Sequence, residues 1–158
     1  MADAQPQEIR GVLIQVEGAR LLLPNATISE VLSFATPDPV ENAPDWLLGR
    51  IRWRGWQLPL VSFARLSGTA EEHGDTRSKV IILKALGGNP RAPYFALLTQ
   101  GFPRLVTVSR DRLVFDAEAQ SGLPEAVQAS VMLNEETAWV PDLVRIESAI
   151  SEVMRAAA

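Results

Sequence analysis

A chain of 158 residues, of which 47% are hydrophobic and 22% charged, has the composition of one globular domain or of two very small ones that share a core. The absence of cysteine and the single histidine exclude thiol catalysis, disulfide scaffolds, iron–sulfur clusters and most zinc sites. A formal net charge of −4 argues against a general nucleic-acid binder, although an acidic chain can carry a local basic face.

The first residues have none of the features of a signal peptide. Residues 1–8 are small and polar, with neither a basic stretch nor an apolar core, so we expect a disordered tail. The apolar runs in the chain are far shorter than the roughly 20 residues of a membrane helix. We therefore expect a cytoplasmic protein without direct membrane insertion.

Alternating hydrophobicity predicts strands at the start of the folded part. Residues 9–16 alternate between two faces, Glu17-Gly18 suits a tight turn, and residues 20–23 return along the first strand. Residues 25–32 fit either a short helix or a bent strand. The beginning of the chain is therefore expected to form a hairpin followed by one further element.

A second hairpin is predicted after a proline-rich loop. Residues 47–53 and 56–63 have the character of strands on either side of Arg54-Gly55, which suits a tight turn. Pro59 lies inside the second of these strands and has no N–H group to donate. We therefore expect it at the edge of a sheet or at a bulge.

The second half of the chain repeats this arrangement more loosely. Residues 67–78 are polar and contain two glycines, so we expect a solvated linker. Further strands are predicted at residues 79–85, 94–99, 105–109, 113–115, 129–133 and 137–140. Apolar residues then recur at helical spacing over 141–155, with Pro141 at the first helical position and Asp142 beside the positive end of the helix dipole.

Motifs of common enzymes are absent from the sequence. The chain has no G-x-S-x-G, no Walker A motif and no G-x-G-x-x-G. Glu71, Glu72, His73 and Asp75 are metal-ligand types, but a solvated loop is the more ordinary explanation for such a cluster. We therefore expect a protein that is not an enzyme and that binds no metal and no cofactor.

One stretch stands out, because arginine and tryptophan alternate over residues 49–56. In a strand, Arg50, Arg52 and Arg54 would share one face, opposite to Trp53. Three guanidinium groups in a row repel one another unless carboxylates face them. Those carboxylates could belong to a partner or to this chain: Glu30, Asp38 and Asp45. Arginine and tryptophan are also enriched at interface hot spots, although a solvated face with tryptophans in the core would explain the same pattern.

These residues resemble the CheW-like adaptor family of bacterial chemosensory arrays. Residues 21–24 read Leu-Leu-Leu-Pro and are followed by Ile28 and Glu30, as in the first block of the family pattern. The second block covers residues 44–66 and includes the Arg54-Gly55 pair at the family's spacing. The second half of the chain resembles the family in layout, but Ser62 and Thr99-Gln100 stand where the family carries acidic residues.

The resemblance implies an all-β fold of two SH3-like five-stranded β-barrels packed around a shared core, with a C-terminal amphipathic helix. A single CheW-like domain would cover residues 9–155. It would contain approximate subdomains 9–66 and 79–140, joined by the linker 67–78, and a terminal helix at 141–155.

The resemblance also implies a non-catalytic role in chemotaxis and two-component signal transduction. Members of the family couple the cytoplasmic tip of a methyl-accepting chemoreceptor to the regulatory domain of a CheA-type histidine kinase. The departures from the family pattern suggest a divergent accessory adaptor, of the kind that serves a chemosensory system linked to type IV pili.

Individual roles follow from the matching positions. Arg54 and Gly55 fall on the Arg-Gly pair that couples receptor and kinase, and Ile28 and Glu30 fall on the neighbouring receptor-facing segment. The predicted partner-binding residues are Arg54, Gly55, Ile28, Glu30, Arg50, Arg52 and Trp56. The predicted structural residues are Pro24, Gly49, Trp53 and Pro59.

Two other functions remain open from the residues alone. The arginine row could bind a small anion between the two halves of the chain. Arginine and tryptophan on a small barrel could also stack nucleic-acid bases, although the negative net charge and only two lysines argue against a nucleic-acid partner.

Overall fold

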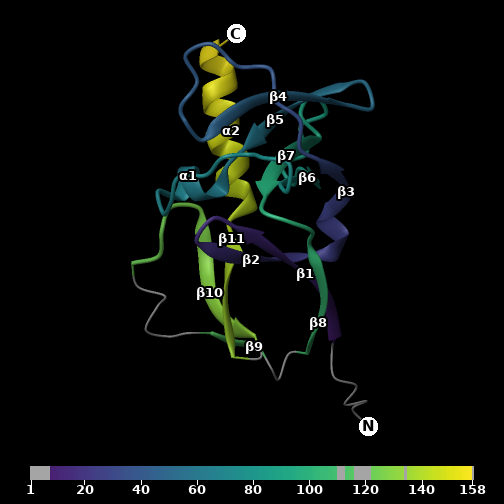
Figure 1. Cartoon of the computed structure of the whole chain (residues 1–158), viewed down its shortest axis with the longest axis vertical. Helices are drawn as coiled ribbons and strands as arrows, with labels where there is room; N and C mark the ends of the chain where they lie inside the picture. Colours follow the sequence, from purple (N-terminus) through teal and green to yellow (C-terminus); the bar gives the residue numbers. More distant parts are fainter. Residues whose placement is uncertain (1–7, 110–112, 116–121, 134, 158) are drawn as a thin grey trace.

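The computed structural model describes residues 8–109, 113–115, 122–133 and 135–157 (Figure 1). These residues form eleven strands in two sheets, together with two α-helices and one 3-10 turn. Sheet A occupies the lower half of Figure 1 and sheet B the upper half. Within the described residues, no helix is both long enough and apolar enough to cross a membrane.

Sheet A has six strands in the order β8-β1-β2-β11-β10-β9. Their bounds are β1 Glu8–Val16, β2 Ala19–Pro24, β8 Arg104–Ser109, β9 Leu113–Phe115, β10 Val127–Leu133 and β11 Glu136–Pro141. Sheet B has five strands in the order β3-β6-β7-β5-β4. Their bounds are β3 Ile28–Ser33, β4 Leu47–Trp53, β5 Trp56–Val61, β6 Lys79–Lys84 and β7 Tyr94–Thr99.

The two sheets do not follow the two halves of the sequence. The N-terminal hairpin β1–β2 pairs with β8 and β11, and β6 and β7 pair with β3 and β5. Both sheets therefore combine strands from either side of residues 67–78, instead of following the expected subdomains 9–66 and 79–140. Parallel pairs such as β11 with β2 join segments that are far apart in sequence, and hydrophobic alternation carries no information about such partners.

The closed five-stranded barrels are also corrected. Sheet A has six strands, and within the described residues its edge strands β8 and β9 do not pair with each other. The edges of sheet B, β3 and β4, do not pair as strands either. Only an isolated bridge between Asp38 and Arg50 joins β4 to the segment that follows β3. Each sheet is thus open in its backbone hydrogen bonding.

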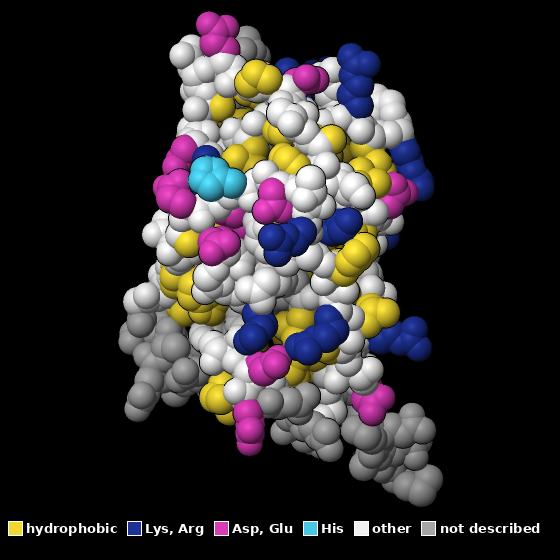
Figure 2. All heavy atoms as spheres, in the orientation of Figure 1, with side chains coloured by type: hydrophobic (Ala, Val, Ile, Leu, Met, Phe, Trp, Pro, Cys, Tyr) yellow, Lys and Arg dark blue, Asp and Glu magenta, His cyan; other side chains and the backbone are white. Residues whose placement is uncertain are grey.

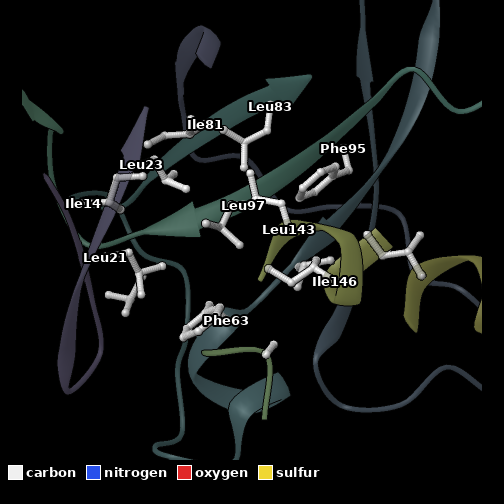
Figure 3. Packing of buried hydrophobic residues seen from close by; sticks show 14 of the residues in the cluster. Ile14, Leu21, Leu23, Phe63, Ile81, Leu83, Phe95, Leu97, Leu143 and Ile146 are labelled. Atoms are coloured by element: carbon white, nitrogen blue, oxygen red, sulfur yellow. The ribbon is translucent and has the colours of Figure 1, made fainter. Parts of the chain in front are cut away.

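Both faces of each sheet are nevertheless buried. Neighbouring residues of a strand point to opposite faces. Ile14 and Leu97 belong, with residues of α2, to the core cluster between the sheets (Figure 3), whereas Leu13 belongs to a cluster on the other face of sheet A and Leu98 to one on the other face of sheet B. Each sheet therefore curves around a small core of its own. This double burial explains why β7 reads as a continuous apolar run.

The C-terminal helix α2 covers Leu143–Ala157, close to the predicted 141–155. The sequence predicts Pro141 as the first residue of this helix, but Pro141 is the last residue of β11. Asp142 caps the helix, because its Oδ1 accepts a hydrogen bond from the backbone N–H of Arg145 at 3.0 Å. Further along the helix, the Glu147 carboxylate accepts hydrogen bonds from the backbone N–H groups of Leu86 and Gly87 at 2.8 and 2.9 Å. The helix is thus fixed to the β6–β7 connection as well as to the core.

We expect Asp142→Ala to lower the free energy of unfolding by about 1 kcal/mol, the usual effect of losing an N-cap. Urea denaturation would measure the change. Asp142→Ser keeps an oxygen that can cap the helix and should retain most of the stability. Equal losses in both variants would contradict the capping role.

Other boundaries shift by small amounts. Residues 25–32 are a 3-10 turn, η1, at Asn25–Thr27 followed by β3, so the bent-strand alternative is nearer the truth. Glu8 is part of β1, whereas residues 1–7 of the predicted tail lie outside the described residues. The second strand of the central hairpin stops at Val61, because Ser62 caps the short helix α1, Phe63–Ser67.

Candidate partner-binding site

The β4–β5 hairpin ends in a two-residue turn formed by Arg54 and Gly55. Trp53 and Trp56 are the last paired residues, and the two turn residues have positive φ angles of 47° and 82°. Two consecutive left-handed residues define the type I′ turn that matches the twist of a hairpin. A Cβ on Gly55 would meet nothing within 4 Å, so glycine is required by its φ angle and not by lack of space.

Glu30 of β3 holds this turn with both of its carboxylate oxygens. Its Oε1 accepts from Nη2 of Arg54 at 2.8 Å, and its Oε2 accepts from Nε1 of Trp53 at 3.2 Å. β3 and β4 are opposite edges of sheet B. The Glu30 contacts therefore join these two edges through side chains, in addition to the isolated backbone bridge between Asp38 and Arg50.

The Arg54 guanidinium lies over the indole ring of Trp53. Its Cζ is 5.0 Å from the centroid of the Trp53 ring, within the range of a cation–π contact. Trp53 is buried and packs edge-on against Tyr94 at 4.9 Å. The Arg54 side chain nevertheless remains 69% exposed. It is thus a cation in a fixed position, with several N–H donors still open to solvent.

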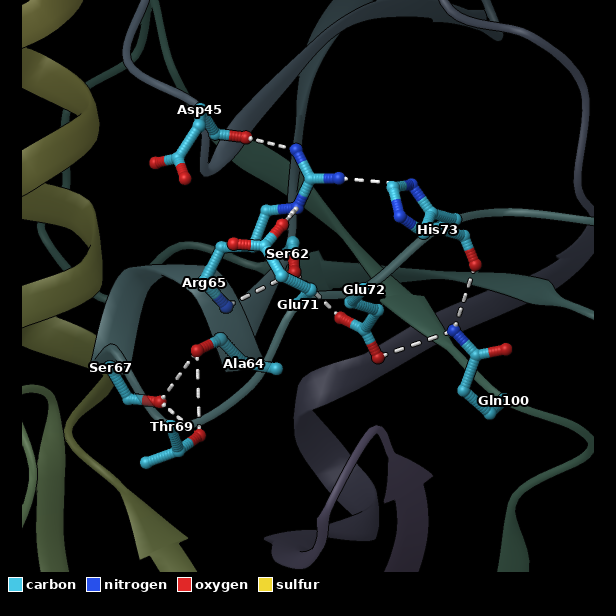
Figure 4. A network of polar contacts seen from close by, with 10 residues as sticks. All are labelled: Asp45, Ser62, Ala64, Arg65, Ser67, Thr69, Glu71, Glu72, His73 and Gln100. Carbon is cyan, nitrogen blue, oxygen red and sulfur yellow. Dashed lines mark hydrogen bonds and ion pairs between the residues drawn. The ribbon is translucent and has the colours of Figure 1, made fainter.

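A second polar site lies at the junction of the two sheets, in the segment predicted to be a solvated linker (Figure 4). Glu72 is only 1% exposed. Its carboxylate accepts from Ser62 Oγ at 2.7 Å, from the backbone N–H of Glu17 at 2.8 Å and from Nε2 of Gln100 at 3.2 Å. A solvated loop was therefore the wrong expectation at this position. Within the described residues, no group of His, Asp or Glu side chains could hold a metal ion.

A family model of the CheW-like domain matches residues 10–150. The chain belongs to the CheW-like domain family. The structure of the scaffolding protein TtCheW from Thermoanaerobacter tengcongensis matches this CheW-like protein with a TM-score of 0.72. The match covers 90% of each chain at 14% sequence identity, which shows a common fold. Among the curated proteins, no sequence matches this chain.

The predicted row of three arginines on one face of a strand is wrong for the CheW-like hairpin. Arg50 and Arg52 belong to β4, whereas Arg54 lies in the turn and leans over Trp53 toward Glu30. The period of two residues that places side chains on one face ends where φ becomes positive. Within the described part of the chain, neither Arg50 nor Arg52 has a carboxylate partner, so Glu30 neutralises only Arg54.

The remaining predicted contact residues differ in exposure. Trp56 is 37% exposed, and its ring lies 6.4 Å from that of Tyr94. Ile28 is half-buried and packs against the core between the sheets, so only part of its side chain can face a partner. Tyr94, which the sequence did not nominate, makes edge-on ring contacts with both tryptophans of the hairpin. No pattern in the sequence around Tyr94, which lies on β7, predicts its contact with the β4–β5 hairpin.

The residues predicted to be structural each affect the backbone in a different way. Gly49 has a φ of 145°, and a Cβ there would lie 2.3 Å from the carbonyl oxygen of Asp38. Pro24 ends β2, and its carbonyl accepts a bond from Thr27 Oγ1 at 2.7 Å. Of the two places expected for Pro59, the sheet edge is wrong, because β5 lies between β4 and β7, whereas the register of β4 against β5 does shift between Leu47 and Gly49, next to the Arg50–Pro59 pair. The pairing of β5 with β7 begins only at Leu60, so the missing N–H of Pro59 falls outside it.

Proposed function

We propose that this CheW-like protein is a non-catalytic signalling adaptor. In this role it couples the cytoplasmic tip of a methyl-accepting chemoreceptor to the regulatory domain of a CheA-type histidine kinase. The observation that carries the proposal is the Arg54 side chain, which is held in place by Glu30 and Trp53 and yet remains mostly exposed. A side chain that is already ordered loses little conformational entropy when it binds a partner.

The neighbouring residues of the hairpin extend this surface. Gly55, Arg52 and Trp56 are exposed on the same β4–β5 hairpin, and Arg50 is half-exposed on β4. Arginine offers bidentate contacts to carboxylates, and tryptophan supplies apolar area, as is usual at interface hot spots. We infer that acidic groups of the receptor tip or of the kinase bind at this hairpin, with Ile28 and Glu30 at its border.

Membership of the family supports a scaffold role, and the departures from the family's sequence pattern suggest which chemosensory system the chain serves. TtCheW is described as a scaffolding protein, and we extend that role to this chain. A cytoplasmic location would bring it to the receptor tips. The neutral residues Ser62 and Gln100 favour an accessory adaptor of a system linked to type IV pili over a flagellar one.

Binding of a small anion at the arginine row has less support. The Arg54 guanidinium pairs with the Glu30 carboxylate at 2.8 Å and does not share a face with Arg50 and Arg52, so the three cations do not converge on one anion. The hairpin is better suited to a macromolecular partner, which can add contacts to Trp56 and Arg52 without breaking that pair.

Reconstitution tests the proposal directly. The purified chain would be mixed with the signalling fragment of a chemoreceptor and with a CheA-type kinase from the same organism, and complexes would be collected by sedimentation. We expect receptor and kinase to sediment together, and kinase autophosphorylation to respond to the receptor, only when the chain is present. Failure to bind both the receptor fragment and the kinase regulatory domain would refute an adaptor role.

A further inference from the structure

Phe102 is the most exposed large hydrophobic residue among those described, at 75%, and it lies in the connection between β7 and β8. Leu105, three residues further on, is 72% exposed. Single exposed apolar side chains are common on protein surfaces and need no explanation by themselves. The significance of Phe102 comes from the charged groups gathered around it.

Three cations either contact the Phe102 ring or line a cavity together with it. The Nζ atom of Lys79 is 4.5 Å from the ring centroid, a cation–π distance. Arg20 and Arg104 line, together with Phe102, a cavity of about 240 Å³ in the surface of sheet A. Gln15 and Arg20 also line a second cavity of about 310 Å³ that extends toward Trp139. In the view of Figure 2, Lys and Arg side chains lie beside exposed hydrophobic atoms at the level of sheet A.

The charge of this surface is opposite to that of the whole chain. Among the described residues, the one carboxylate that lines the smaller cavity is Glu136, and it already binds Nη2 of Arg104 at 2.8 Å. Arg20 has no ion pair with any carboxylate in the described ranges of the chain. A protein of net charge −4 thus presents a cationic hollow with an aromatic ring at its border.

We propose that this hollow is a docking site for an acidic peptide segment of a partner protein. A carboxylate of the segment would bind Arg20, and an adjacent apolar side chain would cover Phe102 and Leu105. The site shares no residue with the Arg54 hairpin, and so the proposal does not depend on the function assigned to that hairpin. It adds a second surface, on the other sheet, through which the chain can hold a protein.

A peptide suits the hollow better than a nucleic acid does. A phosphodiester backbone carries a negative charge at every nucleotide, and beyond the hollow it would meet a chain of net negative charge. A short segment with one or two carboxylates and an apolar residue matches both the local positive charge and the exposed ring.

The test uses a fluorescein-labelled peptide of alternating glutamate and leucine and measures its anisotropy with the full chain. We expect Arg20→Glu and Phe102→Ala each to weaken binding at least tenfold while the melting temperature stays within a few degrees. Arg155→Glu, which changes an exposed arginine on α2, is the matched control and should bind like the unchanged protein. Unchanged binding by Arg20→Glu would overturn the proposal.

Two further measurements identify the class of partner. A single-stranded oligonucleotide and vesicles of anionic phospholipid are tested in place of the peptide, and tighter binding of either would overturn the proposal in favour of that ligand. Arg54→Glu should weaken peptide binding much less than Arg20→Glu does. The hollow can therefore fail while the adaptor function stands, and the adaptor function can fail while the hollow still binds the peptide.

Discussion

Replacing Glu72 by alanine should lower the free energy of unfolding by about 2–4 kcal/mol, since an unpaired buried donor such as the Ser62 hydroxyl costs about 1–3 kcal/mol and two partly buried donors lose an acceptor as well. The substitution would leave the Ser62 hydroxyl, the Glu17 N–H and the Gln100 amide without their common acceptor. The effect should extend beyond the local segment, because Glu17 belongs to the turn of the β1–β2 hairpin in sheet A, whereas Ser62 and Gln100 follow strands of sheet B.

Urea denaturation would measure the loss, and hydrogen exchange would locate it. The backbone N–H of Gln100 bonds to the carbonyl of Gln15 at 2.7 Å and so joins the two sheets directly. Its exchange should accelerate in Glu72→Ala. Glu71→Ala is the matched control, because that side chain is 76% exposed and should change stability by less than about 0.5 kcal/mol. A Glu72→Ala variant as stable as the control would show that the network does not hold the sheets together.

Glu72 also shows where sequence reasoning stops. Residues 67–78 have the composition of a linker, and no local pattern distinguishes Glu72 from its exposed neighbour Glu71. Burial of Glu72 depends on three donors that come from elsewhere in the chain. A hint was present, because Ser62 and Gln100 replace expected acids with neutral donors, and both of them bind Glu72.

The strands themselves were easier to predict than their partners. Alternation and turn residues placed the β1–β2 and β4–β5 hairpins within a residue or two, since both depend on neighbouring residues. The pairing of the N-terminal hairpin with β8 and β11 depends on contacts across more than half of the chain. The family resemblance named the fold but did not say which strands pair with the N-terminal hairpin.

For the site, the sequence predicted the exposed Arg54-Gly55 turn but not the direction of its arginine. Three acids of the chain were candidate partners, and only Glu30 reaches the guanidinium, because it lies on the opposite edge of sheet B. Strand periodicity alone predicts that Arg54 lies on the same face as Arg52. The positive φ at Arg54 redirects the side chain over Trp53.

Reversing the charge of Arg54 should separate the two roles that the structure allows for this residue. We expect Arg54→Glu to weaken binding to the receptor fragment or to the kinase regulatory domain at least tenfold. It should change the stability of the isolated protein by only about 1 kcal/mol, because exposed ion pairs contribute little. Pull-down assays and thermal melts would measure the two effects. Arg155→Glu, which changes an exposed arginine on α2, is the control for a general change of surface charge.

The double variant Arg54→Glu with Glu30→Arg decides what the partner recognises. It restores an ion pair between β3 and the turn but places the positive charge on the other residue. If the partner binds the guanidinium of Arg54, binding should stay weak in the double variant even where the melting temperature recovers. If the pair serves only to hold the hairpin in position, binding should return with stability. Recovery of binding would therefore contradict a direct contact by Arg54 and leave Glu30 and Arg54 as a side-chain closure of sheet B.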